Sequence, residues 1–260
     1  MALNLNDDQL SRYSRHLLLT EIDELGQKRL LDARIVLVGL GGLGSPAACY
    51  LAAAGVGQLV LCDHDKVDAS NLQRQILFDH GDIGRPKVDA AAARIRALNP
   101  DVRPVPYPGR LGGATLIKAV ANADLVVDGS DNFDTRLALS AACVAYRTPL
   151  VSGAVAGFSG QVTVFRHDLF PGPCYHCLYG TGESPRNSCA EGGIFAPLAG
   201  IIGATQAAEA IKTLLDIGES MSGRLLRLDG RNMRWREARL RPDPACQVCA
   251  GRGPKRCENP

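Results

Sequence analysis

This 260-residue sequence lacks the signals of export, of membrane insertion and of strong net charge. Its first residues, MALNLNDDQL, contain an acidic pair and no basic stretch before an apolar core, so they do not resemble a signal peptide. No apolar run approaches the ~20 residues that a membrane-spanning helix needs. The net charge of +2 gives no electrostatic case for binding nucleic acid or an anionic membrane. We therefore predict a cytoplasmic protein with neither a nucleic-acid nor a membrane partner.

A disulfide framework is also not expected, although nine cysteines are present. Their number is odd, and no secretion signal accompanies them. Four of the cysteines form two C-x-x-C pairs, which indicate metal binding or redox chemistry instead.

Strand-like apolar runs alternate with helical patterns over the first 150 residues. Helices are expected over residues 7–31, 44–54, 86–99 and 135–146, and strands over residues 34–39, 59–63, 102–107, 125–128 and 149–153. In the first helix, Leu10, Tyr13, Leu17 and Leu18 are expected to share one face. The prolines of 102–107 favour a strand at a sheet edge. The alternation predicts an α/β fold with a Rossmann-like, mostly parallel sheet and helices on both faces.

The pattern changes after about residue 150. A strand is expected at 161–165, a loop rich in glycine, proline and cysteine at 171–193, and one long helix at 196–215. Two final runs, 224–229 and 234–240, suggest antiparallel strands. We expect an N-terminal helical segment over 1–30, a main domain over 31–250 with halves 31–150 and 151–250, and a flexible tail over 251–260.

A glycine-rich loop joins the first predicted strand to the helix that follows it. The loop contains Gly39, Gly41, Gly42 and Gly44 in the pattern G-x-G-x-x-G. In this context glycines let phosphate oxygens approach backbone N–H groups at a helix N-terminus. Asp63 ends the next strand, where a carboxylate can reach ribose hydroxyls. The combination favours a nucleotide site over a ligand-free turn, and it does not separate NAD from ATP.

Polar and charged side chains follow neighbouring strands at the same edge of the predicted sheet. Asn71, Arg74 and Lys87 come after the second strand, and Asp131 comes after strand 125–128. Hydride transfer needs little positive charge here, whereas nucleotidyl transfer gathers charge at the α-phosphorus and favours Arg, Lys and a carboxylate that holds Mg²⁺. Each residue alone is more simply a solvated surface group. Together they favour nucleotidyl transfer.

The two C-x-x-C pairs have the spacing of a Cys₄ zinc site, with Cys174 and Cys177 in one half and Cys246 and Cys249 in the other. A redox function is the alternative, but redox C-x-x-C motifs usually begin a helix in a βα unit. Four thiolates complete a tetrahedral site, so we interpret His176 as a bystander. The sequence therefore predicts structural zinc.

Cys189 stands apart from these pairs, in the glycine-rich segment RNSCAEGG. The nearby Arg186 would favour its thiolate form. Both a reactive thiol and an idle one remain open.

Several motifs occur in a characteristic order along the chain: RYSRHLLL, VGLGGLGS, DHDKVDASNLQRQ, GRPKVDAA, DGSDNFDTR, LVSGAVAGFSGQVTVF and the two C-x-x-C pairs. In this combination the chain resembles the MoeB/ThiF/HesA family of E1-like enzymes. The resemblance implies ATP-dependent adenylation of the C-terminal glycine carboxylate of a small ubiquitin-like sulfur-carrier protein that ends in Gly-Gly. It is strongest toward members that serve molybdenum cofactor biosynthesis with a MoaD-like carrier. A ThiS-type carrier of thiamine biosynthesis, or another sulfur-carrier pathway, is the alternative.

The resemblance also implies roles for individual residues. By this resemblance, ATP is held by the glycine loop, at Gly42, and by Asp63, and its sugar and phosphates are contacted by Asn71, Arg74 and Lys87. Asp131 serves Mg²⁺ and catalysis, and Arg15 reaches the site of a neighbouring subunit. Zinc is bound by Cys174, Cys177, Cys246 and Cys249, and Cys189 matches a thioester or acyl-disulfide position of some members. The implied cofactors are ATP, Mg²⁺ and Zn²⁺, and the implied assembly is a homodimer. Residues 31–150 would form the nucleotide half of the adenylation domain, and residues 151–250 the carrier and zinc half.

Two functions of other classes remain open on the sequence alone. An NAD-dependent oxidoreductase shares the glycine loop and Asp63, but it leaves the cations and the cysteine pairs unexplained. A non-catalytic scaffold for a ubiquitin-like protein is expected to have lost Arg74, Lys87 or Asp131, and all three are present.

Overall fold

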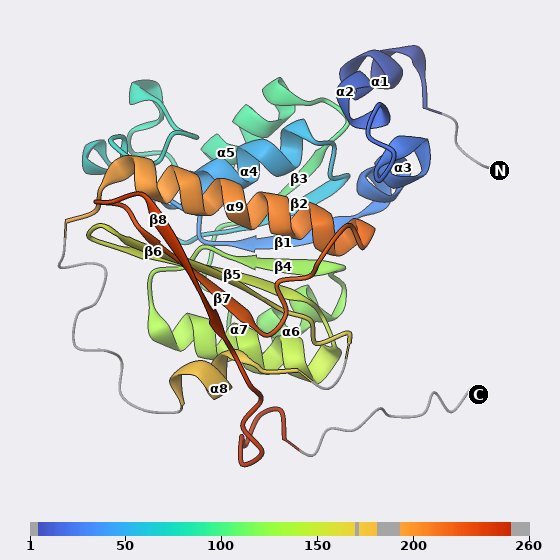
Figure 1. Ribbon diagram of the computed structural model, residues 1–260. Coiled ribbons are helices and arrows are strands. Elements are labelled where there is room, and N and C mark those ends of the chain that lie inside the picture. The colour runs from blue at the N-terminus through green and yellow to red at the C-terminus, as the bar shows by residue number, and fades with distance from the viewer. Residues whose placement is uncertain (1–4, 170–171, 181–192, 251–260) are drawn as a thin grey trace.

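The computed structural model describes residues 5–169, 172–180 and 193–250, in which strands and helices alternate (Figure 1). In chain order the elements are α1 (Asp7–Arg12), α2 (Ser14–Leu17), α3 (Asp23–Asp32), β1 (Arg34–Val38), α4 (Gly44–Ala53), β2 (Gln58–Cys62), η1 (Ala69–Asn71), η2 (His80–Asp82), α5 (Lys87–Leu98), β3 (Arg103–Tyr107), α6 (Gly113–Ala121), β4 (Leu125–Asp128), α7 (Phe133–Tyr146), β5 (Leu150–Ala156), β6 (Ser159–Phe165), α8 (Tyr175–Tyr179), α9 (Ala196–Leu215), β7 (Arg224–Asp229) and β8 (Arg234–Arg239).

A single eight-stranded sheet, in the order β3-β2-β1-β4-β5-β6-β7-β8, runs through the described chain. The first five strands in this order are parallel, and β6, β7 and β8 extend the sheet in antiparallel fashion. The predicted fold class is therefore confirmed. β3 lies at an edge, as its prolines predict, because proline has no N–H to donate to a second neighbour.

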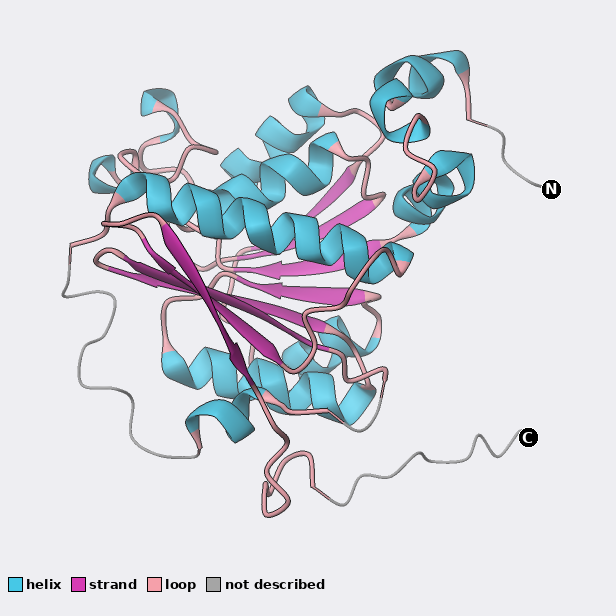
Figure 2. Cartoon of the chain, viewed as in Figure 1, coloured by secondary structure: helices cyan, strands magenta, loops and turns pink. Residues whose placement is uncertain are grey.

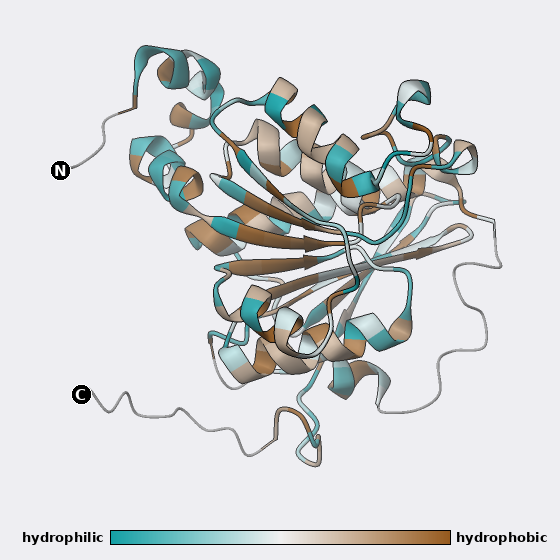
Figure 3. Cartoon of the chain, turned by 180° about the vertical axis from the view of Figure 1, so that it is seen from behind, coloured by the Kyte–Doolittle hydropathy of each residue, from teal (hydrophilic) through white to brown (hydrophobic). Residues whose placement is uncertain are grey.

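Helices cover both faces of the sheet, and the sheet residues alternate between them (Figure 2). Ile35 and Leu37 of β1 pack in a core with residues of α4, α5 and α9, whereas Val36 and Val38 pack in a second core with residues of α6 and α7. Because both faces are covered, the central strands are apolar along much of their length (Figure 3). This burial explains why those strands were recognisable as unbroken apolar runs.

The N-terminal segment differs from the prediction. Periodicity predicts one helix over residues 7–31, whereas the structure has three short helices, α1, α2 and α3. The chain turns at Tyr13, whose buried hydroxyl accepts a hydrogen bond from Asn99 Nδ2 at 2.9 Å and donates to Asp101 at 3.2 Å. Leu18 is 72% exposed, so the expected apolar face does not form. A tertiary contact to a distant polar pair outweighs local periodicity here.

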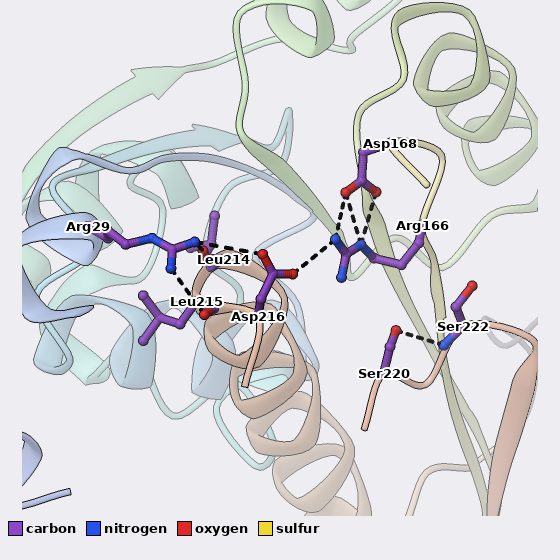
Figure 4. Close-up of polar contacts among 8 residues, drawn as sticks. All are labelled: Arg29, Arg166, Asp168, Leu214, Leu215, Asp216, Ser220 and Ser222. Carbon is purple, nitrogen blue, oxygen red and sulfur yellow. Dashed lines mark hydrogen bonds and ion pairs between the residues drawn. The ribbon is translucent and has the colours of Figure 1, made fainter. Parts of the chain in front are cut away.

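The C-terminal end of α9 is anchored to two other parts of the fold (Figure 4). Arg29 of α3 donates to the carbonyl oxygens of Leu214 at 2.6 Å and Leu215 at 3.1 Å. A cation is favourable there, since the last carbonyls of a helix lack intrahelical partners and carry the negative end of its dipole. Asp216, the C-cap residue, accepts a hydrogen bond from Arg166 at 3.2 Å. These contacts fix the C-terminal end of α9 near the end of the sheet at which the parallel strands begin.

Two helices, α6 and α8, were not predicted from the sequence. α6 begins at the second of two consecutive glycines, Gly113, and α8 is a five-residue helix inside the segment expected to be a loop. Among the described residues, no helix is both long and apolar enough to cross a membrane.

Candidate active site

A cavity of about 630 Å³ opens at the carboxyl ends of the parallel strands. Its wall includes residues that directly follow β1, β2 and β4. From β1 the chain proceeds outward through β2 to β3, and from β4 it proceeds the other way to β5, so the cavity lies where the strand order reverses. Open α/β sheets bind ligands at such points, and this volume suits a small-molecule ligand.

The fold itself requires glycine at two positions of the loop after β1. Gly39 has a φ of +84°, and a Cβ there would lie 2.7 Å from the carbonyl oxygen of Gly129. A Cβ at Gly44 would overlap the carbonyl oxygen of Gly39. At Gly41, by contrast, a Cβ would meet only Gln75 Nε2, at 3.8 Å, among the described atoms. Packing therefore does not demand glycine at Gly41, whereas close approach of a ligand to the backbone would.

Asp63 shapes the same loop from the end of β2. One carboxylate oxygen accepts a hydrogen bond from the Leu40 N–H at 2.7 Å, and the other accepts from the Asp65 N–H at 2.8 Å. Each oxygen keeps a further lone pair for a ligand hydroxyl. α4 begins just beyond, and its N-cap, Leu43, contributes no side-chain cap to the first N–H groups. The glycine loop and a helix N-terminus are thus presented together at the cavity.

Three cations, Lys66, Arg74 and Lys87, line the side of the cavity that follows β2, and the last two have defined contacts. Lys87, the first residue of α5, is only 4% exposed, and its Nζ lies 3.0 Å from Asp65 Oδ2. Lysine is seldom this buried without a partner of opposite charge. Arg74 donates to the Ser70 carbonyl oxygen at 3.1 Å, and its methylene groups pack against Gly42. The positive charge is therefore held in place beside the glycine loop.

The loop after β4 carries two aspartates in different environments. Asp128 is fully buried and accepts hydrogen bonds from the Ser130 N–H at 3.0 Å, the Ser130 hydroxyl at 2.6 Å and the Ser152 hydroxyl at 3.2 Å. It holds the loop in place. Asp131 is exposed and lines the cavity, so its carboxylate is accessible to a cation.

Eight of the residues that the sequence singles out line this one cavity: Gly39, Gly41, Gly42, Asp63, Asn71, Arg74, Lys87 and Asp131. Gly44 lies buried behind the loop and does not line it. Arg15 is exposed on α2, at the opposite end of the sheet (Figure 1). The cavity of one chain therefore does not contain its own Arg15.

Sequence reasoning missed several charged residues of the cavity wall, namely Asp65, Lys66, Asp68, Arg110 and Arg136. Of these, Arg136 is a buried residue, 8% exposed, and its Nη2 donates to the Ser130 carbonyl oxygen. The available signal was its place in the segment DGSDNFDTR, one helical turn after the N-cap Asn132. An arginine so early in a helix that packs on the sheet lies close to the strand ends.

The four paired cysteines meet in a second, separate cluster. Their sulfurs all lie within 4.8 Å of one another, and the pairs Cys174–Cys177, Cys174–Cys246 and Cys177–Cys249 are 3.8, 3.6 and 3.4 Å apart. Sulfurs around a tetrahedral zinc ion at ~2.3 Å would lie roughly 3.8 Å from one another. None of the four forms a disulfide. The cluster thus fits a closed structural zinc site.

Burial raises the pKa of the Cys174 thiol, and a bound cation would favour the ionised form of this sulfur. The Asp243 N–H donates to Cys177 Sγ at 3.4 Å, as expected around a metal-bound thiolate. Cys189 lies outside the described residues.

A model of the ThiF family matches residues 13–248, which include the whole cavity wall. The chain belongs to the ThiF family. Its resemblance to the MoeB/ThiF/HesA group is thereby confirmed.

Curated relatives of this ThiF-family chain span its full fold. An Escherichia coli protein named sulfur carrier protein ThiS adenylyltransferase is 47% identical over 247 residues, which are 95% of this chain and 98% of the relative. The Haloferax volcanii SAMP-activating enzyme E1 is 46% identical over 255 residues, which are 97% of this chain and 93% of the relative. The E. coli molybdopterin-synthase adenylyltransferase is 43% identical over 245 residues, which are 94% of this chain and 98% of the relative. This ThiF-family chain is accordingly an E1-like nucleotidyltransferase.

Solved structures agree on the fold. A crystal structure of E. coli MccB with AMPCPP and MccA matches with a TM-score of 0.80, and the match covers 95% of this chain and 75% of the MccB chain. The two sequences are 23% identical, so the likeness extends to the ThiF fold alone.

Proposed function

We propose that this protein uses ATP to adenylate the C-terminal glycine carboxylate of a small ubiquitin-like sulfur-carrier protein that ends in Gly-Gly. The observation that carries the proposal is the convergence of a glycine loop, two cations and an exposed carboxylate on one cavity. Phosphate binding accounts for the glycine loop, and charge developing at a reacting phosphorus accounts for the charged residues. The names of the curated relatives support a sulfur carrier as the partner.

Within this class, a MoaD-like carrier of molybdenum cofactor biosynthesis is the partner that we propose first. A ThiS-type carrier is the second candidate, because the relative named for ThiS is 47% identical and the relative named for molybdopterin synthase is 43% identical. Both carriers would present the same reactive group.

The cavity would bind ATP at both its phosphates and its ribose. The phosphates would lie over the backbone of the loop at Gly41, where a Cβ would meet only Gln75 Nε2 among the described atoms, and at the adjoining Gly42, and the ribose would reach Asp63. Asn71 would contact the sugar or phosphates from the adjoining wall. Asp63 would serve both the loop and the nucleotide, because each of its oxygens keeps a lone pair.

The chemistry proposed for the cavity is an in-line displacement. A carboxylate oxygen of the carrier bonds to the α-phosphorus, the bond from this phosphorus to the β-phosphate oxygen breaks, and pyrophosphate leaves with the electron pair. The carrier carboxylate is already ionised at neutral pH, so no general base is needed. Arg74 and Lys87 would stabilise the phosphate charge, and catalysis would consist of positioning and electrostatics.

Asp131 is the residue proposed to hold Mg²⁺. Its carboxylate is exposed in the cavity and offers the oxygen ligand that this ion prefers. When bound, the ion would neutralise charge on the phosphates.

Arg15 is proposed to act in the cavity of a second copy of the chain, in a homodimer. Contacts on either side of it fix α2: Tyr13 is hydrogen-bonded to Asn99, and His16 Nδ1 lies 2.9 Å from Oε1 of the buried Gln27. Arg15 itself remains exposed. An exposed arginine on an anchored helix suits a role in a neighbouring subunit.

The β7–β8 ribbon supports a carrier with an acidic surface. Residues 224–241 contain seven arginines and two carboxylates, although the whole chain carries a net charge of only +2. Arg227 of β7 lies directly opposite Arg236 of β8, and both are exposed. Like charges in opposed positions destabilise a sheet, so binding of a negatively charged partner explains this pair better than folding does. We propose the ribbon as part of the carrier docking surface.

Carrier-dependent exchange between ATP and labelled pyrophosphate tests the proposed function. The proposal expects exchange with a Gly-Gly carrier and no fluorescence change with NADH; NADH binding without exchange would favour the oxidoreductase alternative. In the same assay, Arg236→Glu is expected to raise the KM for the carrier and leave the KM for ATP unchanged. Arg103→Glu, on the opposite edge strand, is the matched control.

A further inference from the structure

Two phenylalanine rings lie exposed at the rim of the cavity, and the proposed function uses neither. Phe158 is 41% exposed and Phe195 is 40% exposed, and their rings stack with centroids 5.1 Å apart and planes 25° apart. The guanidinium carbon of Arg231 lies 4.8 Å from the centroid of the Phe158 ring, within the range of a cation–π interaction. Together the three residues form an aromatic patch. Single exposed apolar side chains are ordinary, whereas exposed apolar side chains that gather in one place mark binding sites.

Backbone hydrogen bonds hold this aromatic patch at the mouth of the cavity. Gly157, in the turn between β5 and β6, donates to the Gly193 carbonyl oxygen at 3.1 Å and accepts from the Phe195 N–H at 3.0 Å. The Gly230 N–H donates to the Phe158 carbonyl oxygen at 2.7 Å, which joins the β7–β8 turn to the same place. Gly193, two residues before Phe195, lines the cavity. The aromatic patch therefore lies where the cavity wall meets the β7–β8 ribbon.

The wall of the cavity differs in chemistry from one side to the other. The sides that follow β2 and β4 carry the cations and carboxylates described above. The side formed with β5 and α9 is apolar, and its side chains are Leu43, Val155, Ile194 and Ala199. A Cβ at Gly42 would lie only 3.1 Å from Ala199 Cβ, so the glycine loop directly adjoins this apolar side. A polyphosphate suits the charged sides, whereas an uncharged stretch of peptide suits the apolar side.

We propose that the aromatic patch binds the segment of the sulfur carrier that directly precedes its C-terminal Gly-Gly, through an apolar side chain of that segment. The inference rests on the proposed function for the identity of the partner. The carrier carboxylate must reach the phosphates beside Gly42, so the residues before it must leave the cavity along a wall that accepts an uncharged chain. The apolar side is such a wall, and it leads through Ile194 to Phe195. Beyond the patch, the β7–β8 ribbon, which includes Arg231, would meet the acidic surface of the carrier.

Binding of a fluorescently labelled MoaD-like carrier, measured by anisotropy without ATP, tests the inference. We expect Phe158→Ala and Phe195→Ala each to raise the Kd and the KM for the carrier about tenfold, as aromatic anchors of an interface do. The KM for ATP and the kcat at saturating carrier should stay at the wild-type values. Because both rings are exposed, the melting temperature should change little. Tyr146→Ala is the matched control, since Tyr146 is 47% exposed and lies at the end of α7 far from the cavity.

A substitution in the carrier separates direct contact from indirect effects. Replacement of the apolar residue before Gly-Gly by aspartate should weaken binding to the wild-type enzyme about tenfold. The same carrier should bind Phe195→Ala hardly more weakly than the unchanged carrier does, because the effects of residues in contact do not add. Equal losses with both enzymes would overturn the inference, as would a wild-type Kd for the unchanged carrier in both phenylalanine variants.

Binding without ATP also separates this inference from the proposed function. Binding that depends on the patch, in a protein that adenylates no carrier, would retain the docking site and reject the proposed function. Adenylation with an unchanged Kd in Phe158→Ala and Phe195→Ala would do the reverse, and a carrier that neither binds nor is adenylated would reject both. Sedimentation tests a second copy of the chain as the occupant. Loss of a dimer in Phe195→Ala with unchanged carrier affinity would assign the patch to that contact and overturn the inference.

Discussion

Arg74 and Asp131 reach the cavity from loops that follow two different strands, β2 and β4. If both act on charge at the α-phosphorus, Arg74→Ala and Asp131→Ala should each abolish carrier-dependent ATP–pyrophosphate exchange. The loss of one preorganised group typically costs ~3 kcal/mol, or roughly 100-fold or more in rate. Circular dichroism should show an unchanged fold.

Arg96→Ala and Asp134→Ala are the matched controls, because both residues are exposed and neither lines the cavity. These variants should exchange like the wild type. Near-wild-type exchange in Arg74→Ala or Asp131→Ala would remove that residue from the catalytic set.

His167 gives the fold a dependence on pH. Burial lowers the pKa of this histidine to about 4, whereas in the unfolded chain it is about 6.5. Between these values the unfolded chain binds the proton and the folded chain does not, so the free energy of unfolding should fall as the pH falls from 6.5 to 4, by about 3 kcal/mol at most. Chemical denaturation of wild type and His167→Gln at pH 7.5 and pH 5 should show a smaller loss in the variant. Equal losses would contradict the assignment.

For single residues, the sequence predicted those groups whose chemistry can be inferred from one position and its neighbours along the chain. The glycine loop, Asp63, Asn71, Arg74, Lys87 and Asp131 all follow predicted strands, and the parallel sheet brings strand ends together. Arg136 was missed because its relevance depends on how a helix packs on the sheet. The structural role of Asp128 was equally hidden, since it depends on hydroxyl donors from Ser130 and Ser152.

The role of the cysteine cluster can be measured directly, by metal analysis and thermal unfolding. We expect one zinc ion per chain with sulfur-only coordination, by metal analysis and X-ray absorption. Removal of the zinc should lower the melting temperature more than it lowers the affinity for ATP, because a closed site holds the fold and has no open position for chemistry. A freshly prepared, unchelated sample without zinc would count against the four-cysteine site.

Elements with strong periodicity or unbroken apolar runs were predictable. The predicted long helix, 196–215, has the observed bounds of α9, and the parallel and antiparallel strands follow their apolar patterns. The prediction of one N-terminal helix was wrong because the contact of Tyr13 with Asn99 interrupts that helix, and this contact joins residues that are 86 positions apart. α8 was missed because its five residues are too few for a periodic signal.

At the scale of the whole molecule, the position of Arg15 bears on the assembly. An Arg15→Ala chain and an Asp131→Ala chain should each form an inactive homodimer. In the mixed dimer one site combines both lesions, whereas the other has an intact Asp131 and receives an intact Arg15 from its neighbour. Activity should therefore return toward half of the wild-type value per mixed dimer. If mass spectrometry verifies subunit exchange and no activity returns, Arg15 does not act across subunits.

The net charge of the whole chain did not indicate that positive charge is concentrated in the β7–β8 ribbon. A net charge of +2 argues against an electrostatic partner, yet the β7–β8 ribbon concentrates seven arginines. The family and the residues of the cavity wall named above were accessible from the sequence, whereas the ribbon that we propose as part of the carrier docking surface forms only when two strands pair.

The central claim is that this protein transfers AMP to the C-terminus of a carrier. Intact-mass analysis of candidate Gly-Gly carriers, incubated with the protein, ATP and Mg²⁺, tests it most directly. We expect one carrier to gain the mass of a single AMP moiety, a carrier that lacks its last glycine pair to gain none, and the Asp131→Ala enzyme to produce no adenylated carrier. ATP turnover without any adenylated carrier, or adenylation of the truncated carrier, would contradict it.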